Sequence, residues 1–225
     1  SVPYSPGFAD NEQIHGGIKM KTVQTVIGNV DTNKLGSVLM HEHIYSSSMG
    51  VALSYPQLYK EGTEEKIEKD LKEMKANGIE TVVDAPVGLG RDVRGLKRAS
   101  QKTGVNIVAT TGWWGMEPPY AGNIPEEKWA QAFEDDINKG CDGTDIKAGI
   151  LKAAMDKEGP TPWNIKTHHA VGMAQVATGK KIMLHTYCPT ETPRHQLNLL
   201  KEVGVDMNNV SVGHIPETTD MDFVK

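Results

Sequence analysis

Short apolar runs alternate with longer, mostly polar stretches along most of the chain. Runs this short and this continuous are typical of strands that are buried on both faces of a parallel sheet. They are "SVLMHEH" (37–43), "ETVVDAP" (80–86), "NIVATTG" (106–112), "IKAGILKAA" (146–154), "KIMLHTY" (181–187) and "VSVGH" (210–214). The pattern therefore predicts about six parallel strands.

The stretches between these runs have the spacing of amphipathic helices. In "TEEKIEKDLKEMKANG", Ile67, Leu71 and Met74 recur at helical intervals, and the Asn-Gly end is typical of a helix stop. The other predicted helices cover 91–104, 125–140, 163–179 and 193–204. Strands that alternate with helices predict an α/β fold in which helices cover a parallel sheet.

Two closures of such a sheet compete, the open doubly wound sheet and the (β/α)8 TIM barrel. A doubly wound nucleotide-binding sheet is expected to have a glycine-rich turn after its first strand. Here the first strand ends in His-Glu-His, which favours the barrel. The sequence contains only about six of the eight βα units that a barrel requires.

The first residues differ from this pattern. Residues 1–20 are polar, aperiodic and interrupted by glycine and proline, which predicts an N-terminal surface arm. Residues 21–225 form the predicted barrel domain, and its first stretch, "KTVQTVIGNV", predicts a hairpin.

Composition excludes several classes of function. A net charge of −5 provides no basic surface for nucleic acid, and no apolar run approaches the length of a membrane span. Cys141 and Cys188 are too few for a disulfide framework, which weakly favours a cytoplasmic location. No signal peptide is visible, but the first residue is not methionine, so a periplasmic or secreted location stays open.

The candidate chemistry lies at the ends of the predicted strands. His41 and His43 are two residues apart in one strand, so their side chains project to the same side. Lys152, His185 and His214 lie at or near the ends of three later strands. The strand ends of a barrel form one face, where active sites lie, so these residues predict a shared metal site. The alternatives are structural histidines and a lysine paired with a carboxylate.

The motifs "LGSVLMHEHI", "GIETVVDAP", "GLGRDV", "IVATTGWW", "IKAGILKAA", "IMLHTY" and "VSVGHIPETTD" resemble the phosphotriesterase family of the amidohydrolase superfamily, over about residues 22–225. The resemblance implies a barrel with two divalent metal ions, usually zinc, with cobalt, manganese or iron as alternatives. It implies that His41 and His43 hold the buried metal and that His185 and His214 hold the more exposed one. Lys152, carbamylated, would bridge the two ions.

The resemblance implies a hydrolase in which a hydroxide that bridges the metals attacks an ester. A lactone or carboxylic ester is the first expectation, and a phosphotriester or organophosphate is the alternative. The family's general-base aspartate at the end of strand eight has no counterpart here, because the sequence ends after the sixth predicted strand. A non-catalytic binding protein or an inactive fragment is therefore the alternative of another class.

Several other residues have weaker assignments. Trp114 matches an aromatic residue that lines the family's substrate pocket, and Tyr187 follows a predicted metal ligand, so both are candidate substrate contacts. Asp84 and the Arg91-Asp92 pair are interpreted as structural. His168 and His169 are expected on a solvated helix face. The resemblance also implies a homodimer.

Overall fold

The computed structural model describes residues 11–15, 18–58, 62–215 and 218–224. The chain divides into two compact units, which are described separately. One unit comprises the described parts of Asp10–Thr111 and Asp135–Gly149, and the other those of Gly112–Glu134 and Ile150–Lys225. No helix within the described ranges is long and apolar enough to cross a membrane.

The first unit begins with a small antiparallel sheet of three strands, β1 (Asn11–His15), β2 (Ile18–Thr25) and β3 (Gly28–Asp31). The β2–β3 hairpin confirms the predicted one, and it pairs Thr25 with Gly28. Residues 1–10 and 16–17 of the predicted arm lie outside the described residues. Residues 11–15 and 18–20 are strand instead of irregular chain, because their backbone groups pair with each other across the sheet.

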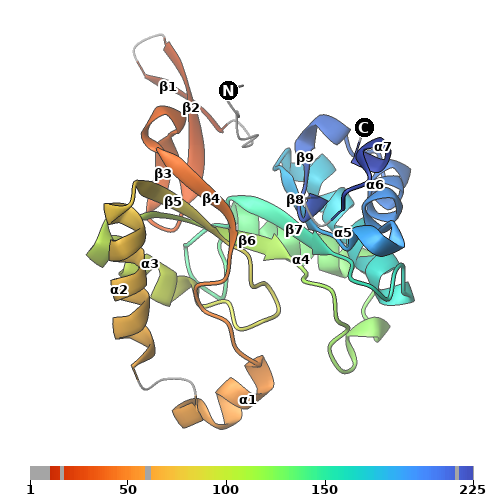
Figure 1. The fold of residues 1–225 in the computed structure, drawn as a ribbon, viewed down its shortest axis with the longest axis horizontal. Helices are drawn as coiled ribbons and strands as arrows, with labels where there is room; N and C mark the ends of the chain where they lie inside the picture. The colour runs from red at the N-terminus through yellow and green to blue at the C-terminus, as the bar shows by residue number, and fades with distance from the viewer. Residues whose placement is uncertain (1–10, 16–17, 59–61, 216–217, 225) are drawn as a thin grey trace. The chain divides into compact units, whose positions relative to one another are not determined.

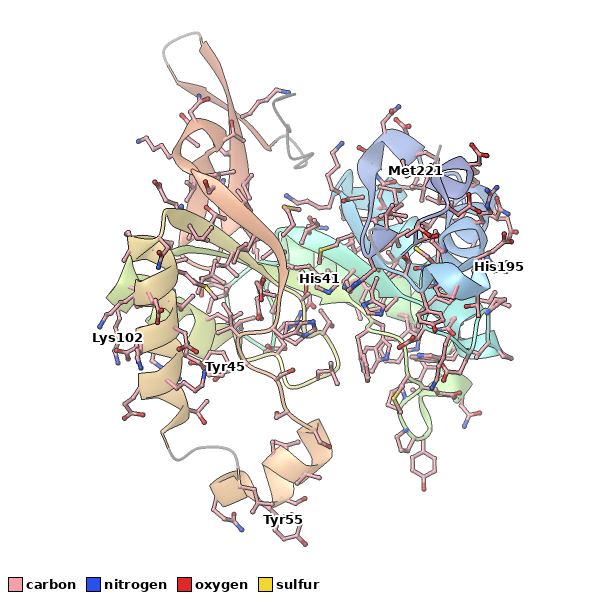
Figure 2. The ribbon with its side chains drawn as sticks, in the orientation of Figure 1. His41, Tyr45, Tyr55, Lys102, His195 and Met221 are labelled. Atoms are coloured by element: carbon pink, nitrogen blue, oxygen red, sulfur yellow. The ribbon has the colours of Figure 1, made fainter. Side chains whose placement is uncertain are left out.

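Three parallel strands form the main sheet of this unit, β4 (Ser37–Glu42), β5 (Ile79–Asp84) and β6 (Asn106–Gly112). The turn η1 (Thr32–Lys34) precedes β4. Between the three strands lie α1 (Met49–Ser54), η2 (Pro56–Leu58), α2 (Thr63–Ala76) and α3 (Val93–Thr103). Helix α2 packs on α3 and on β5 (Figure 1). Lys102 on α3 donates to Glu68 on α2, so the two helices are also joined at their solvent side (Figure 2).

The second unit contains three further parallel strands, β7 (Ile150–Ala154), β8 (Ile182–His185) and β9 (Val210–Val212). The helical elements in and next to this unit are η3 (Ala121–Asn123), α4 (Glu126–Asn138), α5 (Pro162–Thr178), η4 (Cys188–Thr190), α6 (Thr192–Glu202), η5 (Met207–Asn209) and α7 (Met221–Val224). Helix α5 packs on β7 and on α6 (Figure 1).

The strands are buried because both of their faces are covered. Val82 and Val83 in β5 are adjacent residues that point to opposite faces, and each is fully buried. Leu151 in β7 and Leu184 in β8 are also fully buried. Burial on both faces is the property that the continuous apolar runs predicted, and it confirms the α/β fold with parallel strands and covering helices.

Candidate metal site

His41 and His43 lie at the end of β4 in the first unit. His41 is the second-last residue of the strand and His43 follows its last residue. Their ring centroids are 5.5 Å apart, as expected for side chains that project to one side of a strand. His41 is half-buried and His43 is exposed. Two imidazoles at this separation can donate nitrogen ligands to one metal ion.

The segment that follows His43 is fixed by the end of β5. Asp84 Oδ1 accepts a hydrogen bond of 2.7 Å from the backbone N–H of Ile44, and Glu42 O accepts one of 2.8 Å from the N–H of Ala85. The Asp84 side chain is completely buried, and burial raises its pKa to about 8. Asp84 therefore holds the strand end that carries the two histidines, in agreement with its structural interpretation.

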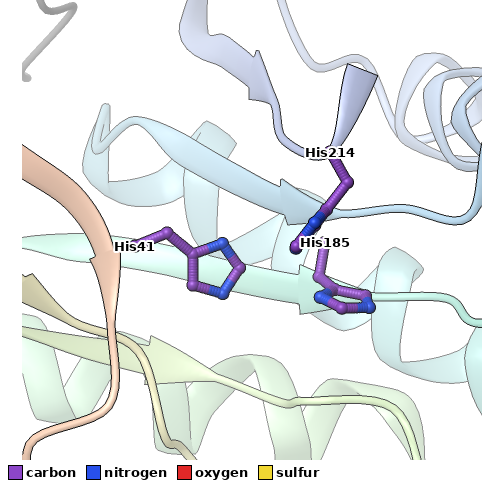
Figure 3. A group of neighbouring side chains, drawn as sticks. All are labelled: His41, His185 and His214. Carbon is purple, nitrogen blue, oxygen red and sulfur yellow. The ribbon is translucent and has the colours of Figure 1, made fainter. Parts of the chain in front are cut away.

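His185 and His214 lie at the ends of β8 and β9 in the second unit. Their ring centroids are 4.4 Å apart and their planes are 63° from parallel (Figure 3). The hydroxyl of Thr186 donates to Gly213 O at 2.7 Å, and the N–H of Gly213 donates to Leu184 O at 2.9 Å. These bonds hold the two strand ends together. The structure thus brings this predicted pair of ligands into contact.

The backbone at His214 is specialised. Its φ is 59°, in the left-handed region that residues other than glycine seldom adopt. The carbonyl of His214 accepts a contact of 3.5 Å from the Cys188 thiol, which lies beyond the end of β8. Such a conformation costs free energy, and residues that hold it are found mainly at functional sites.

Lys152 lies on β7, the strand next to the one that ends in His185. Its side chain is only 1 % exposed, and burial lowers its pKa to about 7. In the β7–β8 register Lys152 is opposite Met183, and Ala154 is opposite His185. At pH 7 an amine with this pKa is about half in its neutral, nucleophilic form, compared with a very small fraction for an ordinary lysine.

Gly112 allows another segment to approach Lys152 closely. The φ of Gly112 is 109°, and a Cβ at this position would lie 2.0 Å from Lys152 O. The next residue, Trp113, donates its backbone N–H to the same oxygen at 3.0 Å. The segment after β6 is therefore fixed against the strand that carries the lysine.

Trp113 anchors this segment through an aromatic cluster. Its ring centroid is 5.5 Å from that of Trp129 and 6.0 Å from that of Trp163, and Trp129 and Trp163 are 5.6 Å apart. Trp114, the predicted substrate contact, follows Trp113 in the chain and is half-buried. Tyr187 is also half-buried, and its backbone N–H donates to the Thr192 hydroxyl at 2.6 Å. Their contact with a substrate stays a prediction.

Arg91 has the structural role that the sequence suggested. Its guanidinium donates to Asp136 Oδ2 at 2.8 Å, to Asp142 Oδ1 at 2.7 Å and to Thr110 O at 2.8 Å. The Thr111 hydroxyl also donates to Asp136 Oδ2, at 2.6 Å. These bonds tie the segment after β5 to the end of β6.

The expectation that His168 lies on a solvated helix face is wrong. His168 is completely buried, with Nε2 2.8 Å from Gln196 Oε1 and Nδ1 2.6 Å from Asn164 O. Helix α5 has a wide buried face that includes His168. Adjacent residues on a helix point in directions about 100° apart, so His168 and His169 have different environments. The sequence signal was the low charge of the helix, in which Lys166 is the only Asp, Glu, Lys or Arg residue between 162 and 178. The neighbouring His169 is partly exposed and lies 3.4 Å from Glu126 and 3.2 Å from Glu202.

Comparison with known proteins places this arrangement in a family context. The model of the phosphotriesterase family matches residues 21–225. A phosphotriesterase homology protein of Mycobacterium tuberculosis is 34% identical over 220 residues, which cover 92% of this chain and 67% of that protein. An aryldialkylphosphatase of Saccharolobus solfataricus is 33% identical over 201 residues, which cover 88% of this chain and 64% of that protein.

A more distant relative and a solved structure also match this chain. The human N-acetyltaurine hydrolase is 26% identical over 228 residues, which cover 87% of this chain and 65% of that protein. The structure of the phosphotriesterase from Mycobacterium tuberculosis superimposes with a TM-score of 0.85 at 32% identity, covering 90% of this chain and 66% of that one. The chain thus spans about two thirds of the length of the relatives that it matches.

Proposed function

The chain belongs to the phosphotriesterase family, and we propose that it is a metal-dependent hydrolase that cleaves a lactone or a carboxylic ester. The observation that carries this proposal is the buried Lys152 beside the strand that ends in His185. A fully buried lysine amine is unfavourable in itself, because burial penalises its charged form. A metal site can use such an amine as the source of an anionic ligand.

We propose five metal ligands, His41 and His43 from the first unit and Lys152, His185 and His214 from the second. The donor chemistry supports a pair of divalent ions, with zinc as the first expectation, because imidazole nitrogen and carboxylate-like oxygen are common zinc ligands. When bound, such ions supply Lewis-acid activation of water and of the ester. The five residues themselves would hold the ions.

Lys152 would contribute as a carbamate. Its neutral amine nitrogen forms a bond to the carbon of carbon dioxide and loses one proton, which leaves an anion with two oxygen donors. Burial favours the neutral amine that this step requires, since it lowers the pKa to about 7. With two oxygens, the side chain of Lys152 would be able to serve as a ligand shared by a pair of ions.

Trp114 and Tyr187 are proposed to contact the substrate. Both follow strands that carry or adjoin the proposed ligands, and both are half-buried. An indole and a phenol ring provide apolar area for the organic part of an ester, together with a polar group that can orient it. The neighbouring Trp113 is anchored by Trp129 and Trp163, which holds the backbone of the segment that carries Trp114.

Phosphotriester hydrolysis is the second candidate. It is favoured by the relative named as an aryldialkylphosphatase, which is 33% identical to this chain. A further relative is named as an N-acetyltaurine hydrolase, so amide substrates belong in the test as well. The same ligands serve attack on carbon or on phosphorus, so the residues around the metals must determine the choice.

The test is hydrolysis of lactones, aryl carboxylic esters, dialkyl aryl phosphates and N-acyl amides. We expect activity that a chelator abolishes and that zinc or cobalt restores. His41→Ala should lower kcat/KM at least ~100-fold, because it removes a ligand. His195→Ala is the matched control, since His195 is an exposed histidine on α6 (Figure 2). Full activity in His41→Ala, or hydrolysis that resists the chelator, would contradict the proposal.

A further inference from the structure

A chain of buried polar groups connects α5 and α6 to the last residue of β8. His168 on α5 and Gln196 on α6 are both completely buried. His168 Nε2 and Gln196 Oε1 are 2.8 Å apart, and Gln196 Nε2 donates to the carbonyl oxygen of His185 at 3.0 Å. The same carbonyl accepts a second hydrogen bond of 3.1 Å from the N–H of Met155.

The other end of this chain reaches the neighbouring strand. His168 Nδ1 lies 2.6 Å from the carbonyl oxygen of Asn164, which is 5 % exposed. The Asn164 amide donates to Ala154 O at 3.3 Å and to Gly115 O at 3.1 Å. Ala154 ends β7 and is opposite His185 in the register. The polar groups therefore fix the ends of two adjacent strands and the segment that carries Trp114.

Packing alone does not require these groups. Elsewhere the two helices pack through apolar contact, as where the side chain of the buried Leu200 on α6 lies against Gly172 on α5. Placing an amide and an imidazole in the same interior costs free energy unless their polar atoms are paired. What the pairs add is direction, because a hydrogen bond fixes the orientation of a peptide group and an apolar contact does not.

The amide orientation of Gln196 is set by the His185 carbonyl. Its Nε2 donates to that carbonyl, and its Oε1 lies 2.8 Å from His168 Nε2. A neutral imidazole carries a single N–H, so the tautomer with its proton on Nε2 is the one that donates to Gln196. The reverse orientation would place Oε1 against the His185 carbonyl oxygen, and two acceptors would then face each other. His168 thus holds Gln196, and Gln196 holds the peptide of His185.

We propose that Gln196 and His168 are positioning residues for the ligand His185. They fix the His185 peptide so that the imidazole faces His214, 4.4 Å away between ring centroids. This inference rests on the proposed function, because it requires that His185 binds a metal ion. Groups that orient a metal ligand typically affect metal affinity by about 10- to 100-fold.

The test is cobalt binding by the full chain with Gln196→Met, which keeps the length of the side chain and removes both hydrogen bonds. We expect the more weakly held of the two ions to bind about 10- to 100-fold less tightly than in the unmodified chain. The visible absorption of the cobalt form at saturation should also change, because it reports the arrangement of the ligands. Loss of stability alone would leave that spectrum unchanged.

Leu200→Ala is the matched control, since Leu200 is a completely buried residue on the same helix and has no polar side-chain atom. It should lower the melting temperature at least as much as Gln196→Met and leave cobalt affinity within about threefold of the original. Gln196→Glu provides a second variant if Gln196→Met does not fold. It keeps an acceptor for His168 and loses the donor to His185 O.

The outcomes separate the two proposals. If the unmodified chain binds cobalt and Gln196→Met binds it equally well with the same spectrum, the positioning role is wrong while the metal site stands. Equal weakening by Leu200→Ala would likewise overturn the positioning role, since it would show a general effect of stability. If the unmodified chain binds no cobalt, the proposed function fails, and the positioning role fails with it.

Discussion

Lys152 lies in an environment far from the ordinary one of a lysine. A lysine ammonium is strongly hydrated, yet this side chain is only 1 % exposed, and desolvation lowers its pKa to about 7. The protein therefore bears a destabilising group at low pH. The free energy of metal binding would compensate for this cost if the side chain served as a metal ligand.

The first prediction concerns the pH dependence that Lys152 creates in chelator-treated protein without carbon dioxide. The folded pKa of about 7 is below the unfolded value of 10.5, so the unfolded chain binds more protons between these values. The free energy of unfolding should therefore rise with pH from 7 to 10.5, by at most about 1.4 kcal/mol per unit. Urea denaturation of the unmodified chain and Lys152→Met should show this rise only in the former. Parallel pH profiles would contradict the buried amine.

Asp84 has the opposite pH dependence. Its folded pKa of about 8 is above the unfolded value of 3.8, so the contribution that is present below pH 3.8 is lost as the pH rises through 8. Asp84→Asn keeps an acceptor for the Ile44 N–H and does not ionise. Relative to Asp84→Asn, the metal-free unmodified chain should therefore lose stability between pH 4 and 8, by about 1.4 kcal/mol per unit at most. A constant difference in unfolding free energy over this range would refute the assignment.

At the scale of the elements, the approach of the segment after β6 to β7 depends on one glycine. Gly112→Ala would place a methyl group 2.0 Å from Lys152 O at a φ of 109°. We expect this variant to lose about 2–4 kcal/mol of stability and to lose metal binding, since β7 must shift. Gly143→Ala is the control, with φ of 67° but nothing within 4 Å of the added methyl. If both variants lost similar amounts of stability, the loss at Gly112 would come from backbone strain alone, and the close approach to Lys152 O would not contribute.

A second element-scale prediction concerns Arg91, whose side chain is 10 % exposed and pairs with Asp136 and Asp142. Arg91→Met should lower the free energy of unfolding by about 3 kcal/mol, because it leaves partly buried carboxylates without their cation. The control is Arg98→Met, since Arg98 is 51 % exposed and its pair with Glu64 should contribute less than about 1 kcal/mol. Chemical denaturation measures both, and equal losses would argue against a special role for Arg91.

The strands and their polar ends could be predicted from the sequence, because burial on both faces requires continuous apolar runs and leaves histidine only where a strand emerges. Strand β1, which pairs with β2, and the short helix α1 could not. Helix α1 has only six residues and exposes Leu53, so no periodic apolar face marks it. The pairing of His168 with Gln196 could not be predicted either, because the two residues are 28 positions apart and lie on different helices.

At the scale of the whole molecule, the proposed ligands are divided between the two units. His41 and His43 belong to one, and Lys152, His185 and His214 belong to the other. Metal binding by this proposed set of ligands should stabilise the folded chain. A ligand that binds only the folded state at 100 times its Kd adds about 2.7 kcal/mol.

This division gives a whole-molecule prediction. Zinc should slow amide hydrogen exchange in β8 and β9 of the unmodified chain, and His41→Ala, a change in the other unit, should reduce that effect. His195→Ala should leave it intact. Zinc protection of β8 and β9 that is independent of His41 would mean that the second unit binds metal alone.

The most direct test of the central claim is the content of divalent metal per chain, measured by elemental analysis of protein purified without added metal. The account predicts about two ions per chain in the unmodified protein and fewer than one in Lys152→Met, because that variant lacks the proposed shared ligand. A content near zero in the unmodified protein after incubation with zinc and bicarbonate would contradict the account. So would an unchanged content in Lys152→Met.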